Sequence, residues 1–193
     1  YLNIHIQNGK DLDQTTIHIN DTQNTPNKEK YGPFPANENL KVRAEGTLDE
    51  NKLKTNEILI KPTDKKQKIN LTFSRKAITK IKDKKNRQKN KIDSMMTDYT
   101  HKLNEAYEHS DFNKIKKFFI SDSEAAQHLK NMVESDKDSS YTSPTIEKMN
   151  SNHDTVRIIT KKDDEHGHEI RSQYTLVYDE DSHKYKIKDY TDI

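Results

Sequence analysis

The chain has 193 residues, of which 29% are apolar and 34% charged, with a formal net charge of +2 and no cysteine. The absence of cysteine excludes disulfides, thiolate nucleophiles and cysteine-ligated zinc, and no apolar run approaches the length of a membrane span. The low apolar content is also found in disordered chains, but the small net charge, nine Tyr, five Phe and recurring Ile favour folded domains. We therefore expect two small modules with thin cores.

Period-two alternation predicts strands in the first part of the chain. Leu2, Ile4 and Ile6 alternate with polar residues, which places the apolar side chains on one face of a half-buried strand. The chain opens inside this strand at Tyr1 without a signal peptide, so we expect it to be cut from a longer protein. The same alternation predicts strands at residues 15–20, 40–44, 53–60 and 69–73. We expect residues 1–74 to form an all-β, sandwich-like module.

The composition changes at residue 75. Residues 75–91 contain nine Lys or Arg and a single acid, Asp83. Apolar residues recur every three or four positions, which predicts one amphipathic helix over residues 78–108. Lys85 and Gln88 interrupt its apolar side. We therefore expect the first half of the helix to stand away from the core and the second half to pack against it.

The rest of the chain predicts two more helices and a sheet. A short helix is expected near residues 111–119, and Ser121 with Glu124 matches a capping box for a third helix ending near Glu134. Four alternating segments predict an antiparallel meander, at residues 145–150, 155–161, 168–178 and 183–190. The overall prediction is an α+β chain in which residues 75–193 form a second module, with helices packed on a four-stranded antiparallel sheet.

Three segments and their order resemble a known family. They are KYGPFP at residues 30–35, LKVRAEG at 40–46 and INLTF at 69–73, followed by the lysine-rich helix. This arrangement resembles the C-terminal half of the teicoplanin-resistance-associated membrane protein (TcaA) family, over residues 14–193. The final helices and sheet resemble the NTF2-like terminal domain of that family.

The resemblance implies a larger, membrane-anchored protein of a Gram-positive cell envelope. Such a protein would carry a cytoplasmic zinc ribbon, one transmembrane helix and a series of small extracytoplasmic domains, of which this chain would be the last. It also implies an association with cell-wall stress and with susceptibility to glycopeptide antibiotics such as teicoplanin. No catalytic residue transfers from the family, and the anchor would lie upstream of this chain.

The basic segment is the strongest candidate site. Its nine residues are Arg75, Lys76, Lys80, Lys82, Lys84, Lys85, Arg87, Lys89 and Lys91. A dense positive field attracts polyanions, so these residues are candidates for binding an anionic wall polymer such as teichoic acid. They cover several sides of a helix, however, and a solvated connecting helix is the alternative. Nucleic acid is disfavoured as a partner because the remaining surface is near neutral and no aromatic platform accompanies the basic residues.

A proline-flanked loop supplies a second candidate. Tyr31 and Phe34 lie in the YGPFP segment, whose prolines and glycine exclude a central strand. Aromatic rings on a rigid loop suit contact with a partner such as an envelope protein. The alternative is that they close one end of the β module.

Metal and enzyme chemistry find little support in the sequence. The acidic and histidine-rich residues of one turn could hold a divalent cation, but they also fit a charged hairpin tip: Asp163, Asp164, Glu165, His166, His168 and Glu169. An NTF2-like cone could use His101, His109, Tyr174 or Tyr178 for acid–base chemistry, yet an isolated helical histidine is more often structural or exposed. No nucleophile elbow or phosphate loop is present. We predict no metal, no cofactor and no catalytic residue.

These patterns favour a non-catalytic, extracytoplasmic part of an envelope protein that binds a wall polymer or a protein partner. The alternative is an NTF2-like domain that binds or converts a small molecule. A cone filled with Tyr, Leu and Ile side chains would favour the first, and an open cavity with a buried Asp or His would favour the second.

Overall fold

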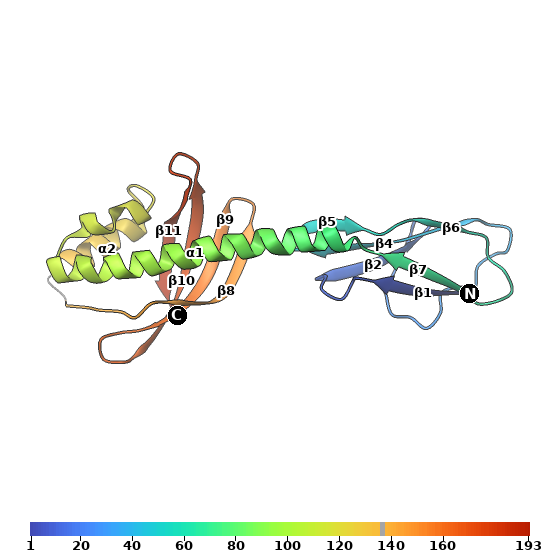
Figure 1. The fold of residues 1–193 in the computed structure, drawn as a ribbon, viewed down its shortest axis with the longest axis horizontal. Coiled ribbons are helices and arrows are strands. Elements are labelled where there is room, and N and C mark those ends of the chain that lie inside the picture. Colours follow the sequence, from blue (N-terminus) through green and yellow to red (C-terminus); the bar gives the residue numbers. More distant parts are fainter. Residues whose placement is uncertain (136–137) are drawn as a thin grey trace. The chain divides into compact units, whose positions relative to one another are not determined.

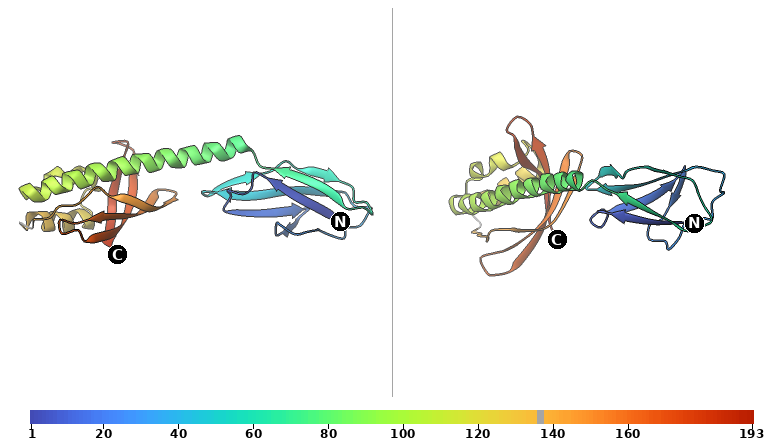
Figure 2. Two further views of the ribbon diagram at one scale, coloured as in Figure 1. Left: turned by 60° about the horizontal axis from the view of Figure 1, so that its bottom comes forward. Right: turned by 45° about the vertical axis from the view of Figure 1, so that its right-hand side comes forward.

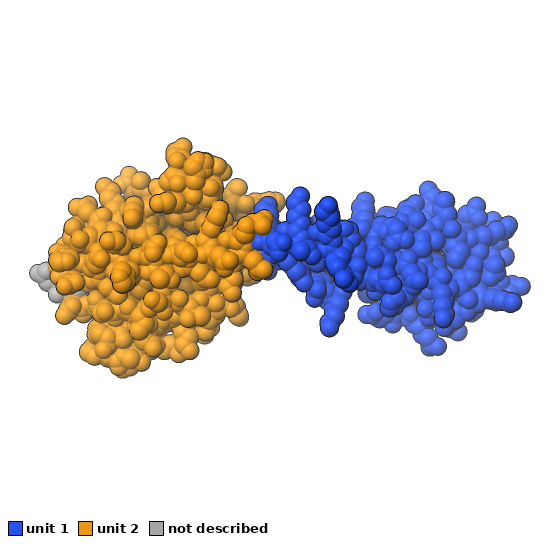
Figure 3. Space-filling model, in the orientation of Figure 1, with its two compact units in different colours: residues 1–85 blue, residues 86–193 orange. Residues whose placement is uncertain are grey.

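The computed structural model describes residues 1–135 and 138–193. The chain divides into two compact units, Tyr1–Lys85 (unit 1) and Asn86–Ile193 (unit 2), which Figure 3 shows in different colours. The sequence prediction places the boundary earlier, after residue 74. The difference arises because the first turns of helix α1 (Arg75–His109) bury Ile78 in the core of unit 1.

Unit 1 contains two sheets. Strands β1 (Leu2–Gln7) and β7 (Gln67–Thr72) form a parallel pair in which Ile4 lies opposite Ile69. The second sheet is antiparallel, with the order β3-β2-β4-β5, and β6 also pairs with β4. Its strands are β2 (Gln14–Ile19), β3 (Thr22–Asn24), β4 (Leu40–Leu48), β5 (Asn51–Lys54) and β6 (Ile58–Ile60).

One hydrophobic core joins these two sheets. Leu2 and Leu71 from the parallel pair and Ile17 and Val42 from the larger sheet are each 0% exposed. Apolar residues alternate with polar ones along β4, as burial of one sheet face requires. The predicted all-β, sandwich-like arrangement is therefore confirmed.

The predicted strand over residues 53–60 is two strands, because Thr55 leaves the regular pairing. Its hydroxyl accepts a hydrogen bond from the Ala44 backbone N–H at 2.9 Å, while its own N–H donates to the Ala44 carbonyl at 3.0 Å. The side chain thereby replaces a main-chain partner and β5 ends at Lys54.

Helix α1 starts three residues before the predicted position. Ser74 Oγ accepts a hydrogen bond from the Ala77 N–H at 3.2 Å, which satisfies a free donor of the first turn. Ile78 is 6% exposed and Ile81 also packs against the unit 1 core. In the described chain the α1 residues of the unit 2 core begin at Ile92, so the first half of the helix stands away from that core as expected. Its packing on the core of unit 1 through Ile78 and Ile81 was not predicted.

Unit 2 places its helices on one face of an antiparallel sheet (Figures 1 and 2). The sheet has the meander order β11-β10-β9-β8. The helical elements are the remainder of α1, the 3-10 turns η1 (Phe112–Lys114) and η2 (Lys116–Phe118), and α2 (Glu124–Glu134). The strands are β8 (Thr145–Asn152), β9 (Thr155–Asp163), β10 (Glu169–Asp179) and β11 (Lys184–Asp192). The predicted α+β fold class is confirmed, although the short helix is two 3-10 turns.

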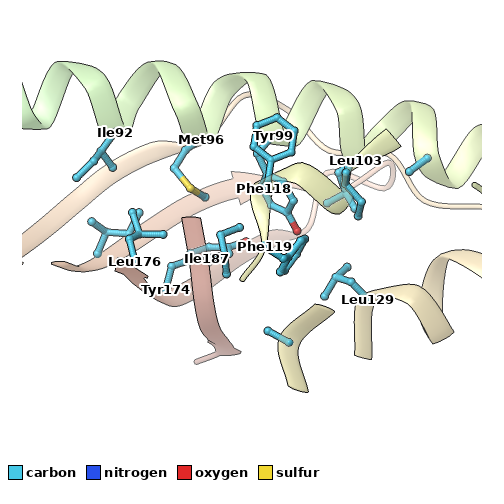
Figure 4. Packing of buried hydrophobic residues seen from close by; sticks show 14 of the residues in the cluster. Ile92, Met96, Tyr99, Leu103, Phe118, Phe119, Leu129, Tyr174, Leu176 and Ile187 are labelled. Carbon is cyan, nitrogen blue, oxygen red and sulfur yellow. The ribbon is translucent and has the colours of Figure 1, made fainter. Parts of the chain in front are cut away.

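The core of unit 2 is filled by aromatic and aliphatic side chains (Figure 4). Tyr99 of α1 is 1% exposed and its ring makes edge contacts with Phe118, Phe119 and Tyr174, at centroid distances of 5.5, 5.7 and 6.3 Å. Leu176 on β10 is 0% exposed against the same cluster. The cluster draws its side chains from both the helical elements and the sheet. No helix in the described part of the chain combines the length and apolar character of a membrane span.

The N-cap of helix α2 lies two residues after the predicted cap. Ser123 is the N-cap, its Oγ accepting from the Ala126 N–H at 3.1 Å, so the predicted cap at Ser121 is wrong.

We expect Ser123→Ala to lower the free energy of unfolding of unit 2 by about 1 kcal/mol, since a donor of the first turn loses its partner. Urea denaturation measures the loss, with Ser121→Ala as the matched control that changes stability little. An equal loss in both variants would contradict the assignment.

Candidate functional site

The nine basic residues of the predicted polyanion site all lie on the first half of α1, and all are exposed. Since they belong to one continuous helix, their positions around its axis follow from their spacing, at about 3.6 residues per turn. This divides them into two groups with different surroundings.

Five of the nine share one side of the helix. They are Lys76, Lys80, Lys84, Arg87 and Lys91, at successive intervals of four, four, three and four residues. That spacing keeps side chains on one helical face, and the five residues are called the basic stripe below. At about 1.5 Å per residue, the basic stripe extends about 22 Å along α1. The sequence analysis, which treats all nine together, predicts no such single row.

The other four basic residues, Arg75, Lys82, Lys85 and Lys89, turn toward the side of α1 that carries Ile78. Lys82 Nζ lies 2.7 Å from Asp11 Oδ2, and Lys85 Nζ lies 2.7 Å from Asp49 Oδ1. The hydrogen bond from Lys82, together with its charge, lowers the pKa of the Asp11 carboxyl. Arg75 donates to the side-chain oxygen of Asn8 at 3.4 Å. Three of these four residues therefore have polar partners within unit 1.

The basic stripe keeps its charge unpaired. In residues 1–135 and 138–193 no carboxylate forms an ion pair with any of its five side chains, whereas Lys82 and Lys85 are both paired. Asp83 lies at the edge of the stripe, and Asp98 takes the same side two turns after Lys91, where the stripe ends. A solvent-exposed row of side chains that all carry positive charge can bind an extended chain of anionic groups along one helix.

Tyr31 and Phe34 pack in unit 1. Tyr31 is 3% exposed, its main chain exchanges two hydrogen bonds with Leu2, at 2.9 and 2.8 Å, and its hydroxyl donates to the Thr25 carbonyl at 2.9 Å. Phe34 is half-buried against the same core. The basic side chain beside the Tyr31 ring is Lys28, whose Nζ lies 5.8 Å from the ring centroid. Both rings occupy the packing role that the sequence analysis gives as the alternative.

The histidine-rich turn is a hairpin between β9 and β10. Asp164 Oδ1 accepts from the backbone N–H groups of His166 and His168, at 2.9 and 2.8 Å, so this carboxylate closes the turn. Gly167 has a φ of 78°, the left-handed conformation that glycine adopts without strain. The described residues contain no group of three or more metal-ligating side chains.

The residues considered for acid–base chemistry do not converge. His101 and His109 are exposed on α1, Tyr174 is 3% exposed inside the core, and Tyr178 is 38% exposed. The ring of Tyr174 makes an edge contact with Tyr99 and stacks with Tyr190, and in the described chain it contacts neither histidine.

Sequence reasoning missed a polar cluster at one end of the inner sheet face of unit 2. Lys162 on β9 is 7% exposed, and its Nζ lies 4.1 Å from the centroid of the Tyr141 ring. Burial lowers the pKa of Lys162 to about 8. A signal for this residue is present in the sequence, since period-two alternation along β9 puts Lys162 on the same face as Ile158 and Thr160.

Comparisons with known proteins identify both units. The model of the TcaA protein 3rd/4th domain matches residues 1–73, and that of the TcaA protein NTF2-like domain matches residues 88–191. A solved NTF2-like protein of unknown function from Shewanella baltica OS155 aligns with a TM-score of 0.38 and 14% identity, covering 52% of this chain and 92% of that one.

Curated relatives carry the name membrane-associated protein TcaA. The Staphylococcus epidermidis protein is 26% identical over 94% of this chain and 41% of its own length. The Staphylococcus saprophyticus protein is 23% identical over 100% of this chain and 44% of its own length, and the Staphylococcus aureus MW2 protein is 25% identical over 83% and 36%. The chain thus spans less than half the length of these relatives. These matches confirm the family resemblance found in the sequence: the chain belongs to the TcaA family, and its second unit is the NTF2-like domain of that family.

Proposed function

We propose that this chain is a non-catalytic, extracytoplasmic part of a membrane-associated envelope protein, and that it holds an anionic wall polymer of the teichoic acid type through the basic stripe of α1. The relatives' name, membrane-associated protein TcaA, supports the membrane association. The role in cell-wall stress and glycopeptide susceptibility follows from family membership as part of the same proposal.

The observation that carries the proposal is the unpaired charge of the basic stripe. Five exposed basic side chains follow one helical side, and acids nearby pair with Lys82 and Lys85 rather than with these five. A polymer with one phosphate per repeat presents charges along a flexible chain, so several weak contacts add up along the helix. Exposed lysines supply such contacts as mobile point charges without fixed geometry.

A wall polymer is favoured over nucleic acid because residues 75–91, which contain the basic stripe, include no aromatic residue. Single-stranded nucleic acid is usually bound by basic grooves combined with stacking platforms. The formal net charge of the chain is only +2, so the positive field is local to α1.

We expect the quadruple variant Lys76→Gln, Lys80→Gln, Lys84→Gln and Lys91→Gln to lose at least about tenfold in affinity for purified teichoic acid, since each basic side chain contributes about 1 kcal/mol near an anionic surface. Glutamine keeps a helix propensity close to that of lysine. A salt titration of binding should give a steep slope for the native chain and a shallow one for the variant.

A matched control removes the same number of exposed lysines from a part of unit 1 outside α1, namely Lys61, Lys65, Lys66 and Lys68. This control should bind nearly as well as the native chain. Equal weakening in both variants would attribute binding to net charge alone and would refute the role of the stripe. Tighter binding to single-stranded DNA than to teichoic acid at the same salt concentration would favour a nucleic-acid function.

A further inference from the structure

The inner face of the unit 2 sheet, which packs against the helices, carries polar residues at one end. Thr160 on β9 pairs in register with Ser172 on β10, and Ser172 pairs with Asp192 on β11. Lys162 follows Thr160 on the same face, two residues along the strand. These four residues are called the polar end. The rest of the inner face, including Leu176, is apolar.

Lys162 has no conventional polar partner. It is 7% exposed, and among the residues that the structure describes it forms no ion pair and no hydrogen bond. Its Nζ faces the Tyr141 ring at 4.1 Å, a cation–π contact. The negative charge of Asp192 favours the ammonium of Lys162, and Asp192 Oδ1 itself accepts a hydrogen bond from Ser172 Oγ at 2.6 Å. A buried ammonium without a carboxylate partner is costly, so its retention calls for a role.

Thr160 adds a second group without a partner. It is 1% exposed, and among the side-chain nitrogen and oxygen atoms of the described chain that are fully shut off from solvent, its Oγ1 is the one without a hydrogen-bond partner. Leaving a buried hydroxyl unpaired costs about 1–3 kcal/mol in proteins. Thr160 and Lys162 lie about 7 Å apart along one strand face, so one anionic group between them can accept from both.

Tyrosine rings surround this end of the sheet. Asn104 on α1 exchanges two hydrogen bonds of 2.8 Å with the backbone of Tyr141, the residue whose ring lies beside Lys162 Nζ. Burial raises the pKa values of Tyr107 and Tyr190, which keeps both hydroxyls protonated. Tyr141 and Tyr190 are half-buried and Asp192 is exposed, so the polar end is where the inner face reaches solvent.

We propose that the polar end binds a small organic carboxylate, whose oxygens accept hydrogen bonds from Lys162 Nζ and Thr160 Oγ1 while its body lies against the tyrosine rings. Asp192 nearby disfavours dense negative charge, so a singly charged carboxylate fits better than inorganic phosphate. The site lies on the sheet of unit 2 and is separate from the basic stripe, so either proposal can fail without the other.

Benzoate is a suitable probe because it combines one carboxylate with an aromatic ring. We expect saturable binding of benzoate to the native chain, followed by NMR shifts of the Tyr141 and Tyr190 rings, and weaker binding of inorganic phosphate. Lys162→Met should weaken benzoate binding at least about tenfold, and Thr160→Val by about threefold, because each removes one donor. Lys161→Met, which changes a neighbouring exposed lysine, should leave binding unchanged.

The pH dependence gives an independent readout. Without ligand the pKa of Lys162 in the folded chain is about 8, so its ammonium is largely deprotonated at pH 9.5. Benzoate should therefore bind the native chain more weakly at pH 9.5 than at pH 7. Among the residues that the structure describes, Asp192 is the charged group that raises the pKa of Lys162, and the Tyr141 ring lies alongside. Equal affinity of the native chain and both Lys162→Met and Thr160→Val would overturn the proposal, and so would the absence of saturable shifts up to about 10 mM benzoate.

Discussion

Replacing Leu176 by alanine is expected to lower the free energy of unfolding of unit 2 by about 2–5 kcal/mol. Leu176 is 0% exposed on the inner face of β10, and its side chain belongs to the cluster formed by α1, η2, α2 and the sheet (Figure 4). The substitution removes buried methyl groups and leaves a cavity that the surrounding aromatic side chains fill only partly. Few single changes destabilise a small domain more.

The matched control is Leu71→Ala in unit 1, where Leu71 is also 0% exposed. The two hydrophobic clusters share no residue, so we expect each substitution to destabilise its own unit most. Hydrogen exchange resolved by peptide segment distinguishes the two responses. If Leu176→Ala accelerated exchange in β1 and β7 as strongly as in β9 and β10, the chain would unfold as one cooperative body and the division into units would be wrong.

Strands were predictable where one face is buried and the other is exposed. In β9, Val156, Ile158 and Thr160 alternate with outward-facing residues, and this local period needs no knowledge of the partner strands. The three-residue strand β3 escaped prediction because its pairing with β2 rests on main-chain hydrogen bonds and on no apolar pattern. Thr55 likewise ends β5 through a contact with Ala44, which is distant in the sequence.

The candidate sites depended more on tertiary structure. The sequence located the basic residues on a helix but not the pairing of Lys82 with Asp11 or of Lys85 with Asp49, because those acids lie in turns far along the chain. Helical spacing alone divides the nine residues into two groups. The structure adds that carboxylates pair with Lys82 and Lys85 in one group, whereas in the described residues none pairs with the basic stripe. Lys162 was missed although its signal is local. Alternation along β9 places it on the inner face, but a lysine in a strand is normally assigned to the exposed face.

Lys162→Met is expected to stabilise unit 2 at pH 7. Burial of Lys162 lowers its pKa from 10.5 to about 8, so the folded state carries the ammonium at pH 7 at a cost of up to about 3 kcal/mol. Methionine retains a long unbranched side chain without the charge. We expect a gain of roughly 1–3 kcal/mol in urea denaturation, because removing an unpaired buried charge outweighs the loss of one cation–π contact.

The native chain should also gain stability as the pH rises from about 8 to 10. In this range the unfolded chain still binds the lysine proton that the folded chain has released, so the free energy of unfolding increases by up to about 1.4 kcal/mol per pH unit. Lys162→Met should lack this increase. Measurements should stop near pH 10, because the raised pKa values of Tyr107, Tyr174 and Tyr190 make the folded state lose stability above that point.

The neighbouring Lys161 provides the control for this pH effect. It is exposed and pairs with Glu169 at 2.9 Å, which raises its pKa rather than lowering it. Lys161→Met should therefore keep the rise in stability between pH 8 and 10 that Lys162→Met abolishes. If the stability of the native chain stays flat over this range, Lys162 remains charged in the folded state because solvent or the Asp192 carboxylate stabilises its ammonium. That result would remove the cost that makes an anionic ligand at the polar end favourable.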